Sequence, residues 1–157
     1  MNKSALITLN GLNVKGNLIL REITIYESNG SLRHLHLDPP KELEFTFAAN
    51  YYYEHVLGGT PMQRPIPQAV PFGVVREVLT DLKSRGFILY TQGVFSYRFL
   101  VKHVGRRHVH QLIELCCAYP DHLPEANCGV EHTKTSVCSL AKTLYLLRKL
   151  PKGKYFL

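Results

Sequence analysis

The chain has 157 residues, of which 45% are hydrophobic, and a formal net charge of +7. This length suits one ordinary domain with a buried core, and no apolar run reaches the roughly 20 residues that a membrane-spanning helix needs. The N-terminus also lacks the apolar stretch and small-residue cleavage site of a secretory signal. We therefore expect an intracellular protein with no membrane partner, located in the cytoplasm, the nucleus or both.

Three strands are expected in the N-terminal part of the chain. Residues 4–9 form an apolar run that ends at an Asn-Gly turn over residues 10–11, and residues 17–26 are rich in β-branched and aromatic side chains. Residues 32–37 alternate leucine with basic side chains until a Pro-Pro pair stops the run. The short connections predict an antiparallel meander of three strands.

An irregular stretch over residues 40–72 follows, with several prolines and a tyrosine tract at residues 51–53. It is predicted to be a long loop with one short helix over residues 54–57. The tyrosine tract could stack nucleic-acid bases, but packing of the loop onto the core is the favoured interpretation.

Helices and strands alternate in the remainder of the chain. Helical spacing of apolar residues predicts three helices, over residues 74–84, residues 95–103 and a C-terminal segment capped by Ser136 or Ser139. Short apolar runs predict strands over residues 87–90 and 109–115, followed by a polar loop over residues 119–127. The pattern predicts an α/β fold in which a mixed sheet, the meander plus parallel strands, is flanked by helices. We expect one domain over residues 1–150 and a basic C-terminal tail over residues 151–157.

The basic residues form two clusters rather than an even scatter. One cluster includes Lys102, Arg106 and Arg107, and the other includes Lys152 and Lys154 near the C-terminus. Such clusters favour a polyanionic partner, because Lys and Arg release condensed counterions when they bind phosphates. A basic surface that only keeps the protein soluble is the alternative.

A metal-ligand pattern, Cys128-x3-His132-x5-Cys138, lies before the last helix. In a reducing compartment cysteines bind metal or pack in the core more often than they form disulfides, and zinc prefers four nitrogen, sulfur or carboxylate ligands. The alternative is that both cysteines are core residues and His132 is a solvated loop residue. Rival ligands are Cys116, Cys117 and His122, although core packing is the favoured role of the two adjacent cysteines.

Four short segments together resemble the motifs of the proofreading-type (DEDDh) exonucleases, which have a ribonuclease-H-like fold. They are LITLNGL at residues 6–12, LREITI at 20–25, YTQGVFSYRFL at 90–100 and CSLAKTL at 138–144. In this resemblance the carboxylates of the family are replaced by Thr8, Asn10, Ser96 and Cys138. Two-metal hydrolysis needs carboxylates around paired Mg²⁺ ions, so the resemblance implies a pseudo-exonuclease.

The replacements are similar to those of the Maelstrom-type domain, a branch of this fold in the germline small-RNA (piRNA) pathway. That branch carries a Glu-Cys-His-Cys zinc set, which this resemblance places on Glu22, Cys128, His132 and Cys138. The Cys-x3-His spacing is one residue longer than in the family pattern. The resemblance implies a structural Zn²⁺ and a context of RNA silencing or genome defence, with silencing-pathway proteins as further partners.

We therefore expect a zinc-stabilised, degenerate nuclease-fold domain that binds nucleic acid, with single-stranded RNA as the preferred form. Two other functions stay open: a residual endonuclease that cuts single-stranded RNA, and a protein-interaction module that binds no nucleic acid. A cysteine hydrolase is disfavoured, because a thiolate that binds zinc is not free to attack a substrate.

Overall fold

The computed structural model describes residues 3–38, 66, 68–112, 123, 126, 128 and 138–150. Several predicted features lie outside these residues: the tyrosine tract, the short helix over 54–57, the C-terminal tail with Lys152 and Lys154, and the candidate ligands Cys116, Cys117, His122 and His132. Within the described residues the chain forms a five-stranded mixed sheet with three flanking α-helices. The predicted α/β fold class is confirmed.

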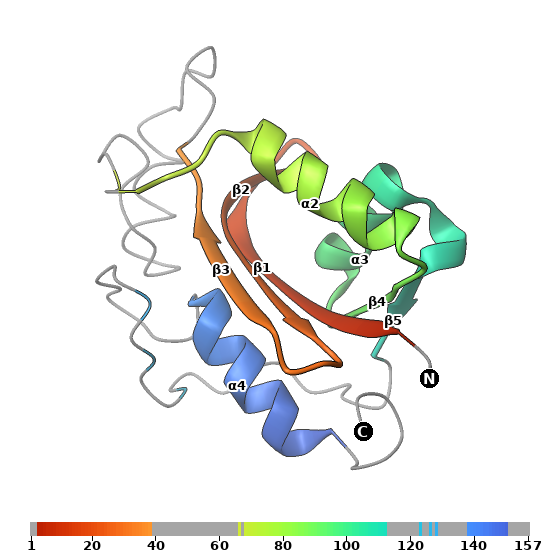
Figure 1. Ribbon diagram of the computed structural model, residues 1–157. Helices are drawn as coiled ribbons and strands as arrows, with labels where there is room; N and C mark the ends of the chain where they lie inside the picture. The colour runs from red at the N-terminus through yellow and green to blue at the C-terminus, as the bar shows by residue number, and fades with distance from the viewer. Residues whose placement is uncertain are drawn as a thin grey trace.

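The sheet combines an antiparallel meander with two parallel strands, in the order β3-β2-β1-β4-β5 (Figure 1). The meander consists of β1 (Ser4–Val14), β2 (Asn17–Glu27) and β3 (Leu32–His36). Strand β4 (Ile88–Thr91) pairs parallel with β1, and β5 (Val109–Gln111) pairs parallel with β4. The expected meander followed by parallel strands is therefore confirmed.

The helices cover both faces of the sheet. Helices α2 (Phe72–Ser84) and α3 (Val94–Val104) lie on one side, and α4 (Ser139–Lys149) crosses the other side (Figure 1). A short 3₁₀ turn, η2 (Arg106–His108), follows α3. No helix among the described residues combines the length and apolar character needed to cross a membrane.

Side-chain alternation along β1 divides the core into two parts. Ala5, Ile7 and Leu9 belong to the large apolar cluster beneath α2 and α3. Leu6 belongs to a smaller cluster with Leu146 of α4. Because neighbouring residues on a strand point to opposite faces, the even-numbered positions of β1 face α4.

The predicted turn at Asn10 and Gly11 is wrong, because β1 continues through both residues to Val14. The chain instead reverses at Lys15 and Gly16, both of which have positive φ angles. The pairing of β1 with β2 shifts register between Asn10 and Gly11, which marks a β-bulge. A Cβ atom on residue 11 would collide with the backbone carbonyl of Ile19, so glycine is needed here for close approach.

The bulge determines which face of the sheet the side chain of Glu22 points to. Leu20 and Ile23 both belong to the cluster beneath α2 and α3, although they are an odd number of residues apart. The bulged residue is Arg21, which has no partner on β1 and donates a hydrogen bond to the carbonyl oxygen of Leu37 (2.9 Å). Glu22 therefore turns to the face covered by α4.

The prediction that Ser139 caps the last helix is also wrong, and Ser136 lies outside the described residues. Ser139 is the first residue of α4, and the N-cap is Cys138, whose side chain makes no capping hydrogen bond. The backbone N–H of Ser139 instead donates to the carboxylate of Glu22, which comes from β2. A distant buried carboxylate thus does what a local cap residue does in other helices.

Replacing Gly11 with alanine should destabilise the fold by about 1–3 kcal/mol, because the new methyl group displaces the backbone at Ile19. Gly73→Ala is the matched control: this α2 glycine has nothing within 4 Å of the added atom. The control should raise the melting temperature, since alanine is the better helix former. Thermal unfolding of both variants tests this, and equal stability of the two would contradict the role of Gly11.

Candidate functional site

A band of polar side chains crosses three strands on the face covered by α4. Adjacent positions in the strand register supply it: Thr8 and Asn10 of β1, Glu22 and Thr24 of β2, and His34 and His36 of β3. Buried polar groups need hydrogen-bond partners, and most of those partners come from the first turns of α4. We call these six residues the polar band.

Hydroxyl groups join the band to α4. The Thr8 hydroxyl donates to the carbonyl oxygen of Ser139 (2.7 Å) and lies 2.6 Å from the hydroxyl of Thr143. The hydroxyl of Thr24 lies 2.8 Å from that of Ser139 and 2.6 Å from Nδ1 of His34. These bonds fix the first turn of α4 over the centre of the meander.

Three of the four positions that the motif resemblance aligns with exonuclease carboxylates are buried. Thr8, Asn10 and Cys138 are all buried beneath or at the start of α4, and none carries a carboxylate. Asn10 has interactions of its own within the protein. Ser96 belongs to α3, whose buried residues pack against the opposite face of the sheet. Ser96 is therefore separated by the sheet from the other three positions, and none of the four side chains is a carboxylate that could hold Mg²⁺.

Glu22 is the acidic centre of the polar band. Its side chain is only 3% exposed, and Oε2 lies 3.7 Å from Nδ1 of His36. Lys142 of α4 donates to the carbonyl oxygen of Leu9 (3.4 Å). Burial lowers the pKa of Lys142, and the nearby Glu22 and Cys138 only partly offset this effect.

A group of possible metal ligands lies beside Glu22. One ligand atom each from His34, His36 and Cys128 lies within 4.8 Å of the others, so these three residues could hold a metal ion. His36 Nε2 lies 2.8 Å from the carbonyl oxygen of Cys128 and 3.2 Å from Nε2 of His34. Burial disfavours the charged form of His36, but hydrogen bonding to Cys128 and the charge of Glu22 outweigh it and raise the pKa of His36.

Cys138 lies next to this group. Hydrogen bonding to Cys128, burial and the charge of Glu22 together raise the pKa of the Cys138 thiol well above its ordinary value. Of the four ligands expected from the sequence, Glu22, Cys128 and Cys138 lie near one another at the start of α4, but Cys128 alone belongs to the described ligand group, which it shares with His34 and His36. The fourth, His132, lies outside the described residues.

Sequence reasoning missed the two histidines of β3. His34 and His36 are two residues apart on a strand, a spacing that sends both side chains to the same face. That spacing was the available signal. It is typical of paired ligands, but nothing in the sequence shows that β3 lies opposite Cys128.

One further observation, at His36, supports a metal ion in this group. His36 Nδ1 is buried and makes no hydrogen bond. Its 3.7 Å separation from Glu22 Oε2 is too long for a hydrogen bond, yet close to the spacing of about 3.4 Å between two ligand atoms about 2.1 Å from a tetrahedral ion. A cation between them would satisfy both groups and favour the thiolate forms of the cysteines.

The expected nucleic-acid-binding residues occupy a separate part of the surface. Lys102 is exposed on α3, and Arg106 and Arg107 are exposed on η2. None of the three forms a salt bridge with another described residue. The sequence contains no Asp or Glu between Asp81 and Glu114, so no acidic neighbour along the chain neutralises this segment.

No protein-family model matches the sequence, and no curated protein matches it significantly. The functional interpretation therefore depends on the described geometry and on the motif resemblance given above.

Replacing Thr8 with valine should lower the free energy of unfolding by about 1 kcal/mol, because it removes the hydrogen bonds from β1 to α4 while keeping the volume. Thr143→Val should have a similar effect, because the single Thr143 hydroxyl proton is shared between Thr8 (2.6 Å) and the carbonyl oxygen of Ser139 (3.0 Å). The double variant should cost less than the sum of the two single variants. Denaturant unfolding of all three proteins tests the contact, and strictly additive losses would contradict it.

Proposed function

We propose that this protein is a zinc-stabilised, non-catalytic domain of nuclease-like fold that binds nucleic acid, with single-stranded RNA as the preferred form. The observation that carries the binding function is the exposed, acid-free basic segment of α3 and η2. The observation that supports zinc is the group of two imidazoles and one thiol, His34, His36 and Cys128, with the Glu22 carboxylate and the Cys138 thiol beside it.

Zinc suits this donor set better than magnesium or calcium. Thiolates and imidazoles are ligands of borderline-soft ions, whereas Mg²⁺ and Ca²⁺ take oxygen ligands. Glu22, Cys128 and Cys138 would supply three ligands. The imidazole would come from His36, which stands beside them, or from His132, which the resemblance implies. When bound, the ion would neutralise the buried negative charge and tie α4 to the meander.

The side chains at the aligned exonuclease positions support a non-catalytic role. The exonuclease positions hold threonine, asparagine, serine and cysteine, and the Thr8 hydroxyl is already bonded to α4. A residual endonuclease would need another set of groups to activate water. A protein-interaction module would leave the basic segment without a function, which is why nucleic-acid binding is preferred.

The basic segment supplies the charge that a phosphate backbone requires. Lys102, Arg106 and Arg107 are exposed and have no salt-bridge partner among the described residues. In contrast, Arg33 and Arg85 are both paired with Glu27 (3.0 and 3.2 Å). The resemblance to Maelstrom-type domains adds the preference for RNA and the silencing context, with Lys152 and Lys154 of the tail as further contacts.

The purified protein should contain about one zinc ion per chain. Cys128→Ser and Cys138→Ser should each abolish zinc binding and lower the melting temperature, because each removes a ligand and leaves buried charge uncompensated. His110→Ala is the control, since His110 is exposed and stacks on Tyr90 away from the site. Elemental analysis and the charge-transfer absorption of the cobalt-substituted protein measure the outcome.

The two candidate imidazoles can be separated by parallel variants. Loss of metal in His36→Ala but not in His132→Ala would assign the ligand to β3, and the reverse would assign it to the segment before α4. A folded, zinc-free wild-type protein that takes up no zinc or cobalt would refute the metal proposal.

Reversing the charge of Arg106 and Arg107 to glutamate should weaken binding of single-stranded RNA by about tenfold or more at low salt. It should also reduce the salt dependence, with the slope of log affinity against log salt falling by about 0.7 for each lost phosphate contact. Both residues are exposed, so the melting temperature should hardly change. Fluorescence anisotropy over a salt series measures both effects.

The matched control is Lys3→Glu with Lys83→Glu, which makes the same change in net charge. Lys83 lies in the last turn of α2, and Lys3 bonds the nearby carbonyl oxygen of Arg85 (3.2 Å). Equal loss of affinity in the two double variants would show non-specific charge attraction only. Absence of any binding by the wild type at low salt would favour the protein-interaction module.

A further inference from the structure

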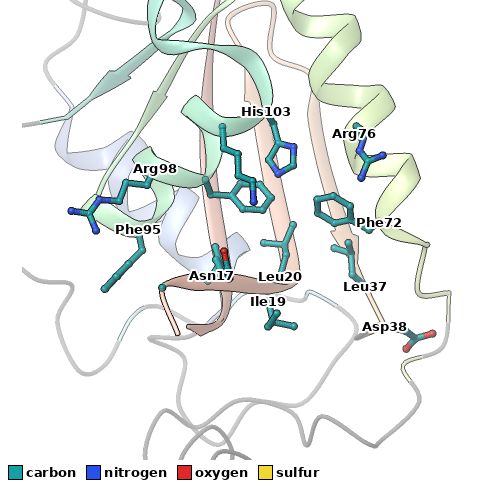
Figure 2. Close-up of a pocket in the computed structure, with 14 residues that line it drawn as sticks. Asn17, Ile19, Leu20, Leu37, Asp38, Phe72, Arg76, Phe95, Arg98 and His103 are labelled. Atoms are coloured by element: carbon teal, nitrogen blue, oxygen red, sulfur yellow. The ribbon is translucent and has the colours of Figure 1, made fainter. Parts of the chain in front are cut away.

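A cavity of about 420 Å³ opens between α2, α3 and the strands beneath them, on the face opposite α4. Its floor is formed by the start of β2 and by Leu37, and its walls by side chains of the two helices (Figure 2). This volume falls in the range of sites that hold one small ligand. Neither the polar band nor the cysteines line it.

Aromatic rings form much of the wall. Phe72 of α2 meets Phe99 of α3 edge-on, with ring centroids 6.0 Å apart, and His103 packs against both at 5.4 and 4.6 Å. Phe95 differs from these rings because it is 51% exposed. A large exposed phenylalanine at the mouth of a cavity offers a flat surface on which a planar ligand can stack.

Cationic side chains stand around these rings. Arg98 and Lys102 extend from α3 and Arg76 from α2, where its guanidinium lies 5.5 Å from the centroid of Phe72. Phe95 and Arg98 are one helical turn apart, so they are neighbours at the same side of the cavity (Figure 2). None of the three cations forms a salt bridge with another described residue.

The positive charge at the cavity is not offset by nearby acids. Asp38 is the one carboxylate among the described lining residues, and it lies at the lower edge of the view, away from the cations (Figure 2). Burial, together with the charges of Lys102 and Arg76, lowers the pKa of His103. The cavity therefore has an excess of positive charge, and an anionic group on the ligand would relieve it.

We propose that this cavity binds one nucleotide of a single-stranded RNA, with its base stacked on Phe95 and its phosphate contacted by Arg98 and Lys102. Arg76 is placed to contact an adjacent phosphate. The inference rests on the proposed nucleic-acid binding and adds its location: the strand runs over the α2 and α3 face and continues from Lys102 towards Arg106 and Arg107. The metal centre stays on the other face.

The ligand must be both planar and anionic to use these features together. A purely apolar ligand would leave the three cations unpaired, whereas an acidic peptide would use the cations without needing an exposed ring beside them. A base with its attached phosphate matches both. Asn17 lies near Phe95 and Asp38 lies at the lower edge of the view, and both can bond sugar hydroxyls or base amino groups (Figure 2).

Tryptophan reporters test this stacking, because the natural chain contains no tryptophan. Phe95→Trp places the only indole at the cavity mouth, and Val94→Trp places it at the adjacent position, which is also exposed but does not line the cavity. Titration with a ten-nucleotide oligoadenylate should quench the emission of Phe95→Trp and leave that of Val94→Trp nearly unchanged. Equal response of the two reporters, or quenching of Phe95→Trp by polyaspartate as well as by the oligonucleotide, would overturn the proposal.

Adenosine monophosphate and inorganic phosphate complete the titration. Quenching by the oligonucleotide at far lower nucleotide concentration than by the monophosphate is the expected result for a site on a strand. Saturation by the monophosphate at the same concentration would overturn the strand location and assign the cavity to free nucleotides. Phosphate alone should not quench.

Affinity measurements separate this inference from the proposed function. Phe95→Ala should weaken oligoadenylate binding by about fivefold to a hundredfold, the range that corresponds to loss of one stacked base, while Val94→Ala should not. Arg98→Glu should also weaken binding. If Arg106→Glu with Arg107→Glu weakens binding but Phe95→Ala and Arg98→Glu do not, the cavity inference fails and the proposed function stands. If the wild type does not bind at low salt, both fail.

Discussion

The buried carboxylate of Glu22 is the group on which the arrangement around α4 depends. The bulge opposite Gly11 turns it to the α4 face, where it accepts the first backbone N–H of that helix and faces His36. A buried negative charge is costly unless it is paired and hydrogen-bonded, and the positive end of a helix dipole is one favourable partner. The start of α4 and β3 must therefore both lie beside this carboxylate. Cys138 is held nearby as the N-cap of α4, and Cys128 is held nearby by the hydrogen bond from His36 of β3.

The two faces of the sheet have different chemistry as a result. On the α4 face, hydroxyls, thiols, imidazoles and one carboxylate bond mainly to one another and to α4, and His36 Nδ1, which makes no hydrogen bond, would bind zinc in the proposal. On the α2 and α3 face, an apolar core extends to a cavity whose rim carries cations without salt-bridge partners among the described residues. In the proposed function, the α4 face serves stability and the α2 and α3 face of the same sheet binds the nucleic acid.

Local patterns predicted the elements, and long-range contacts decided the rest. Alternation along β3 and the helical spacing in α2 were sufficient to predict these two elements, because each pattern reports the burial of one face. The Asn-Gly pair was wrongly read as a turn, since close approach by Ile19 and a tight reversal both call for glycine at residue 11. The cap of α4 could not be predicted, because Glu22 lies far away in sequence. His34 and His36 were missed for the same reason, and the cavity depends on how α2 and α3 meet.

Backbone NMR spectra of the zinc-loaded protein, recorded while a single-stranded oligoadenylate is added, test the division between the two faces most directly. Amide shifts should concentrate in the segment from α3 to η2 and at the start of β2, while the amides of α4 and β3 stay unchanged. Shifts concentrated at α4 and β3 would instead place the nucleic acid over the polar band and rule out binding on the α2 and α3 face.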